Sequence, residues 1–216
     1  MSFLNQLKTQ AKALQQERTA QELHLGELTE RTEQACGLLL HYLQELARSL
    51  SVIQPPGPAL TVDGKTSWPA MKLADFRVDA RRKMLRDREV VDYIAMGWRI
   101  VPQIGEAVTG VVSVNFPTDM RKVEDRLAVG LVRHERHEVR DAERNNVLQE
   151  VRYEYFTETR GAVTATPQHD QGQVHFRLLN TEALDVSQVT VPCARIGHDL
   201  LDELAKRVLG QPSLFL

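Results

Sequence analysis

The chain has 216 residues, of which 42% are hydrophobic and 26% are charged, and its formal net charge is −2. These values are typical of one globular domain, or a domain with an appendage, and they exclude a disordered chain. Because 27 basic and 29 acidic residues nearly balance, no field of one sign attracts nucleic acid or an anionic membrane. No apolar run reaches the roughly 18 residues of a membrane span, and the first residues lack the apolar core of a signal peptide. We therefore expect a cytoplasmic protein.

The first fifty residues carry the pattern of an amphipathic helix. Apolar residues recur every three or four positions among Gln, Lys, Glu and Arg, which are good helix formers, although the stripe fails at Arg18 and Gln21 and resumes at Leu25. From Ala35 the apolar face widens, which suits burial in a core better than the narrow seam of a coiled coil. We expect the earlier part of the stripe to bind a protein partner or a second copy, through Leu4, Leu7, Leu14, Leu25 and Leu28.

Two arrangements of this segment fit the pattern. Gly26 is able to end one helix in a left-handed cap, which gives an antiparallel helical hairpin. Alternatively, one continuous helix runs from Phe3 to Leu50 and is roughly 70 Å long at 1.5 Å per residue. We favour the hairpin slightly, although no proline follows Gly26 to enforce the stop.

A segment rich in proline and glycine breaks the helix at residues 55–58. It divides the chain into a helical arm (1–53), a linker (54–70) and an antiparallel α+β domain (71–216). The dipeptide Asp63-Gly64 predicts a turn within the linker. The neighbouring Gly64-Lys65-Thr66 resembles the end of a phosphate-binding loop, but the glycine that this loop needs five residues earlier is Ala59.

From Met71 the apolar period changes to two, which predicts strands. Three successive strands, which start at Met71, Val90 and Val108, have short connections and predict an antiparallel meander. Further along we expect a helix over 119–127 capped by Thr118, then hairpins of 129–139 with 147–157 and of 162–166 with 174–179, a strand over 186–191 and a last helix that ends near Gly210. The predicted fold is α+β: an N-terminal helical arm or hairpin, then a mostly antiparallel sheet of about six to eight strands with a short inserted helix and a C-terminal helix.

No motif for catalysis, a cofactor or a metal is present. His134 and His137 are three residues apart in a predicted strand, so their side chains point to opposite faces and cannot share a metal ion. We expect this charged segment to form cross-strand pairs with Glu150, Arg152 and Glu154. Cys36 and Cys193 are too few and too far apart for a zinc site or a disulfide framework, and are expected to be buried or partly buried free thiols.

The chain ends in Gln-Pro-Ser-Leu-Phe-Leu. This resembles the peptide Gln-Leu-Ser/Asp-Leu-Phe by which many bacterial replication and repair proteins bind the DNA sliding clamp, with Pro212 as the departure. The resemblance implies that Gln211, Leu214 and Phe215 bind the clamp, in an apolar groove. The alternative, which we favour, is that the apolar tail packs on its own body, because Gly210 and Pro212 turn the chain back after the last helix.

Three function classes remain. The first is a non-enzymatic interaction or assembly protein that uses the helical arm, with a protein partner or itself and without direct nucleic-acid or membrane binding. The second is a ligand-binding or enzymatic α+β domain with a pocket between the sheet and the last helix, lined by Met96, Trp98, Tyr153 and Tyr155. The third is an accessory protein of DNA replication or repair that the tail recruits to the sliding clamp.

Overall fold

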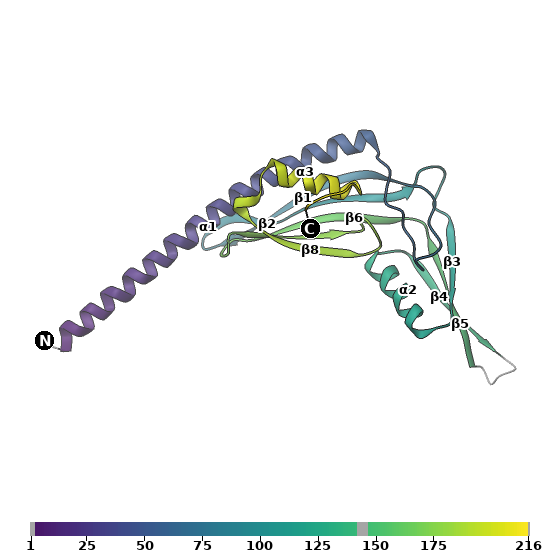
Figure 1. Cartoon of the computed structure of the whole chain (residues 1–216). Coiled ribbons are helices and arrows are strands. Elements are labelled where there is room, and N and C mark those ends of the chain that lie inside the picture. Colours follow the sequence, from purple (N-terminus) through teal and green to yellow (C-terminus); the bar gives the residue numbers. More distant parts are fainter. Residues whose placement is uncertain (1–2, 142–146, 216) are drawn as a thin grey trace.

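The computed structural model describes residues 3–141 and 147–215, and its longest element is a single N-terminal helix, α1 (Phe3–Ile53) (Figure 1). The hairpin that we favoured is therefore wrong, and the continuous helix is observed. Gly26 lies within α1, and a β-carbon built at this position meets no atom within 4 Å. A glycine inside a helix costs about 1 kcal/mol relative to alanine, which the good helix formers on both sides offset.

Antiparallel strands make up the rest of the body, in two sheets. The larger sheet has the order β1-β2-β6-β7-β8 and the smaller has the order β3-β5-β4. The predicted mixed α+β class is confirmed. The strands are β1 (Met71–Leu85), β2 (Arg88–Pro102), β3 (Thr109–Val114), β4 (His134–Asp141), β5 (Val147–Phe156), β6 (Thr159–Gln168), β7 (Gln173–Leu179) and β8 (Val186–Pro192).

The predicted meander of three successive strands is wrong in its third member. β1 and β2 form the expected hairpin, but β3 pairs with β5 in the smaller sheet. The place beside β2 is taken by β6, whose Val163 lies opposite Met96. The segment that follows β2 includes Gly105 with a φ of 77°, a left-handed turn that fits glycine and leads the chain away from the larger sheet.

Helix α2 (Pro117–Val129) lies between β3 and β4 in the chain, and it covers the smaller sheet. Thr118 is not its cap, as we had expected. Phe116 occupies the N-cap position without a side-chain hydrogen bond, and Pro117 begins the helix, where its fixed φ and missing N–H are tolerated. Because α2 extends to Val129, β4 begins at His134 instead of 129. The turn expected over 141–146 falls largely on residues 142–146, which lie outside the described residues.

One face of the larger sheet is covered by the second half of α1 together with α3 (His198–Val208) (Figure 1). The core between them contains Leu39 and Leu43 from α1, Met96 from β2, Phe176 from β7 and Leu201 from α3, all fully buried. A short 3-10 turn, η1 (Cys193–Arg195), connects β8 to α3. Among the helices of the described residues, none is both long enough and apolar enough to cross a membrane.

The proline-rich linker is bound to the body. The N–H groups of Gly57 and Leu73 donate to the carbonyl oxygens of Met71 and Pro55, respectively, so this segment runs beside the start of β1. The predicted turn at Asp63-Gly64 is confirmed. Gly64 has a φ of 79°, and Asp63 accepts hydrogen bonds from the N–H groups of Lys65 and Thr66. Burial raises the pKa of Asp63, but these bonds outweigh it and the pKa is lowered.

Candidate functional site

Helix α1 has one apolar face, interrupted by Arg18 and Gln21, and only the second half of that face is covered. Leu43 and Leu50 are 0% and 3% exposed in the core. Leu7 and Leu14 precede them by 36 residues each, which is about ten helical turns and therefore the same face. Yet Leu7 and Leu14 are 45% and 57% exposed, because this part of the helix projects beyond the body (Figure 1). From here on, the arm means residues 3–28 only, the projecting part of the longer helical arm that the sequence predicts.

The arm meets the body at Leu25 and Leu28, which are half-buried. Leu28 contacts the tight turn between β6 and β7, where a β-carbon added to Gly172 would lie 2.9 Å from its Cδ2 atom. Gly172 also has a φ of 62°, so this position favours glycine twice over. Of the predicted partner-binding leucines, the structure thus places Leu7 and Leu14 on a free surface and Leu25 and Leu28 at its edge. The side chain of Leu4 lies outside those that the structure describes.

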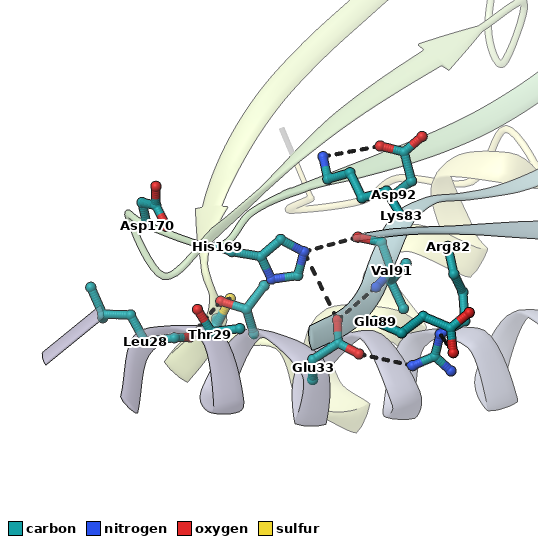
Figure 2. Close-up of polar contacts among 12 residues, drawn as sticks. Leu28, Thr29, Glu33, Arg82, Lys83, Glu89, Val91, Asp92, His169 and Asp170 are labelled. Atoms are coloured by element: carbon teal, nitrogen blue, oxygen red, sulfur yellow. Dashed lines mark hydrogen bonds and ion pairs between the residues drawn. The ribbon is translucent and has the colours of Figure 1, made fainter. Parts of the chain in front are cut away.

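A polar cluster attaches α1 to the sheet where the arm leaves the body (Figure 2). Glu33 is its centre: one carboxylate oxygen accepts from the N–H of Val91 at 2.8 Å and the other accepts from Arg82 at 3.1 Å. Nε2 of the buried His169 lies 2.8 Å from the carbonyl oxygen of Val91. A carbonyl only accepts, so Nε2 carries the proton. One turn earlier, Arg86 donates to Thr29 at 2.9 Å and pairs with Asp170.

This cluster fixes the direction of the arm. Glu33 and His169 are mostly buried, and hydrogen bonds to a charged, desolvated carboxylate are stronger than neutral ones. Sequence reasoning missed all of these residues, since Glu33 and His169 lie 136 positions apart in the chain. The one available signal was Glu33 itself, an acidic residue next to the widening apolar face of α1.

Behind this cluster lie the two cysteines, and both are buried free thiols as predicted. Cys193 lies 3.5 Å from the hydroxyl of Thr32. Burial raises the pKa of Cys36 to about 12, and it also raises the pKa of Cys193. Neither thiol is a nucleophile at neutral pH, because the thiolate is the reactive form.

The C-terminal tail packs on the body. Phe215 is 3% exposed and meets the ring of Phe176 edge-on, with ring centroids 5.2 Å apart. Ser213 and the N–H of Leu214 donate hydrogen bonds to Glu203 of α3, to its carbonyl and carboxylate oxygens respectively. The other two residues of the clamp-like motif, Gln211 and Leu214, are exposed. The structure therefore buries Phe215, an apolar residue of that motif, so its ring is not available on the surface.

A shallow groove lies on the face of the larger sheet that α1 and α3 leave uncovered, with a volume of about 560 Å³. Small residues of β2 and β6, Gly97 and Ala162, form its floor. Its charged lining residues are Arg77, Arg99, Arg160, Asp75 and Asp79. Arg99 pairs with Asp75 and Glu158. Arg77 and Arg160 have no ion-pair partner among the residues that the structure describes.

The four side chains expected to line a pocket between the sheet and the last helix fill the core instead. Met96, Trp98, Tyr153 and Tyr155 are all buried. Tyr155 stacks on Trp68 of the linker, and the hydroxyl of Tyr153 donates to Glu124 of α2. These side chains hold the parts of the body together and do not form one site.

The expected cross-strand charge ladder on β4 and β5 is also wrong. The register places Glu135 opposite Glu154, two like charges, and it places His137 opposite Arg152, which is not an acidic partner. The ion pairs run along the strands instead, for example Arg136 with Glu138 at 2.8 Å. Side chains two residues apart share a strand face, which allows such pairs. Within residues 3–141 and 147–215, no group of three or more His, Cys, Asp or Glu side chains is arranged to hold a metal ion.

Comparisons with known protein families, with curated proteins and with solved structures gave no match to this chain.

Proposed function

We propose that this protein is a non-enzymatic interaction or assembly protein that binds a protein partner, or a second copy, through the arm of α1. One observation supports this proposal above all others. The apolar face that is fully buried at Leu43 and Leu50 continues on the arm, where Leu7 and Leu14 are exposed.

The physical argument is that no packing surface stabilises the helical conformation of the exposed part of the arm. Helices in water are marginal unless an amphipathic face packs on something. Burial of a leucine side chain contributes roughly 1.5–3 kcal/mol, and the exposed stripe offers this gain to a partner. Because the Glu33 cluster fixes the helix where it leaves the sheet, a partner meets a helix with a defined direction, which lowers the entropy lost on binding.

In-cell photo-crosslinking tests this function. A photoreactive amino acid replaces Ala11, within the apolar stripe, or Leu23, on the opposite side of the helix. Leu23 is nine residues, or about two and a half turns, after Leu14 of the stripe, and the half turn places it on the opposite side of the helix. We expect crosslinked products from position 11 and none from position 23. Equal products at both positions, or none at either, would contradict the proposed function.

A second candidate function is the binding of an anionic ligand in the uncovered groove of the sheet. Two guanidinium groups of the groove, those of Arg77 and Arg160, have no ion-pair partner among the described residues and attract negative charge there, although Asp75 and Asp79 also line the groove. The volume, about 560 Å³, falls within the range of small-molecule sites. Replacing Arg160 with alanine should abolish any binding of small dicarboxylates or phosphates seen by calorimetry. Binding that survives this substitution would place the anion elsewhere.

The third candidate, recruitment to the sliding clamp by the tail, requires that Phe215 leave its contact with Phe176. Its affinity would therefore be reduced by the free energy with which the tail packs. Titration of purified clamp with the full chain and with the isolated peptide of residues 211–216 tests it. We expect the peptide to bind more tightly than the chain if the motif is functional.

A further inference from the structure

The charged residues of the arm form no ion pairs with the rest of the described chain, and they are segregated along the helix. Residues 3–16 contain Lys8 and Lys12 and no acidic residue, whereas Glu17, Glu22 and Glu27 follow in the next stretch. None of these five side chains forms an ion pair within the described part of the chain. One half of the arm is therefore basic and the other is predominantly acidic.

The apolar positions of the arm follow a seven-residue repeat. One position of the repeat contains Leu7, Leu14, Gln21 and Leu28. The other contains Ala11, Arg18 and Leu25. Two apolar positions per seven residues form the seam of a two-stranded coiled coil. From 7 to 28 the seam covers about three repeats and about 33 Å.

We propose that the arm pairs with the arm of a second copy of this chain, as two antiparallel helices with Leu7 of each opposite Leu25 of the other. This inference rests on the proposed function and names the partner. In this register Ala11 lies opposite Gln21, and Leu14 lies opposite Arg18. The two bodies then lie at opposite ends of the paired helices and do not compete for space.

The charge pattern selects the antiparallel direction. In antiparallel helices the equivalent flanking positions of the two chains meet, and here Lys8 of each copy meets Glu22 of the other, twice per dimer. In a parallel dimer Glu17 of each copy would meet Glu22 of the other, a repulsion that also occurs twice. The antiparallel register does bring the two Glu17 side chains together on the symmetry axis, but Arg18 of each chain lies beside them.

The polar residues in the seam determine how strong this pairing is. Arg18 and Gln21 occupy positions that leucine would fill in a stable coiled coil, and such residues specify register at a cost in stability. The arm contact is therefore a reversible, concentration-dependent one. The long stem of Arg18 packs along Leu14 of the second copy while its charged group reaches solvent.

Light scattering of the full chain over a range of concentrations tests the pairing. We expect a monomer–dimer equilibrium in which Leu7→Glu or Leu14→Glu weakens the dimer at least tenfold. Leu23→Glu is the matched control, because it introduces the same residue on the opposite side of the helix, where Leu23 is 66% exposed. It should leave the dimer unchanged. Circular dichroism of each variant verifies that the body stays folded.

The direction of the helices is tested by charge reversal. Glu22→Lys weakens an antiparallel dimer several-fold, since it places Lys8 opposite a lysine, but it strengthens a parallel dimer by removing the repulsion from Glu17. Adding Lys8→Glu to Glu22→Lys restores the antiparallel dimer. A dimer strengthened by Glu22→Lys alone overturns the antiparallel proposal.

Distances between spin labels give an independent measure of direction. With Gln15→Cys the labels of the two copies are close, because position 15 meets itself in this register. With Glu27→Cys they are separated by about 33 Å along the axis. A parallel dimer would give short distances at both positions. Cys36 and Cys193 are buried and should stay unlabelled.

Failure of this inference is distinguishable from failure of the proposed function. If the chain is monomeric at all concentrations while crosslinking from Ala11 captures a different protein, then self-pairing is wrong and the arm still binds a partner. If the chain dimerises but Leu7→Glu, Leu14→Glu and Leu23→Glu all leave the dimer unchanged, then another surface is used and self-pairing of the arm is wrong. If crosslinking also fails, the proposed function falls with it.

Discussion

Replacement of Phe215 with alanine tests whether the C-terminal tail is part of the fold. The side chain is 3% exposed and makes an edge-on contact with Phe176. Truncation of a buried phenylalanine to alanine costs about 3–5 kcal/mol, and the lower end applies where neighbours can collapse, as at a chain terminus. For a protein of this size, a loss of about 3 kcal/mol lowers the melting temperature by about 6–12 °C.

The assay is urea denaturation and thermal melting followed by circular dichroism, with Leu214→Ala as the matched control. Leu214 is the adjacent residue and is 88% exposed, so its truncation should change the stability by less than about 0.5 kcal/mol. If Phe215→Ala melts like the wild type, the tail does not contribute to the fold in solution. The docking-peptide interpretation of residues 211–216 would then gain support.

Three further predictions concern the charged and titratable groups. Glu33→Ala should destabilise the protein by about 1–3 kcal/mol, because it leaves the N–H of Val91 without an acceptor, and hydrogen exchange should rise most where α1 leaves the sheet. Lys206 and the N–H of Leu214 hold the pKa of Glu203 below its ordinary value of 4.5. The contribution of Glu203 to stability is therefore present above pH 4.5 and is lost as the pH falls through the lowered pKa. Amide exchange of the tail should increase only below pH 4.5. Cys36, whose pKa is raised to about 12 by burial, should react with a thiol reagent at pH 8 only as fast as the protein unfolds, and fast reaction with the native protein would contradict its burial.

Local patterns in the sequence predicted most elements of the fold. The alternation around Phe76 and Met96 identified the first hairpin, and the dipeptide Asp63-Gly64 identified the turn in the linker. These features depend on neighbours in the chain, whose geometry a short stretch of sequence determines. The final helix and the exposed leucines of the arm could be predicted for the same reason.

Contacts between distant segments could not be predicted. The choice of β5 instead of β2 as the partner of β3 depends on which strand edges remain free after β6 has paired with β2, and no local pattern records this. The binding of Glu33 to Val91 and of Phe215 to Phe176 likewise joins residues that are far apart in the chain. Gly26 alone predicts a hairpin, but the cost of one glycine within a helix is small and the helix formers on both sides of it outweigh that cost.

The length of α1 relative to the sheet explains why the apolar face of this one helix is divided between the core and a free surface. Its 51 residues extend about 77 Å at 1.5 Å per residue. The longest strands, β1 and β2, have 15 residues each, or about 50 Å, and five strands at about 4.8 Å spacing are about 24 Å wide. The helix is longer than the sheet in every direction, so part of the helix must project beyond the sheet, whatever residues that part contains. This projecting part carries Leu7 and Leu14 and a basic half followed by a predominantly acidic half, which are the features that the proposed pairing with a second copy uses.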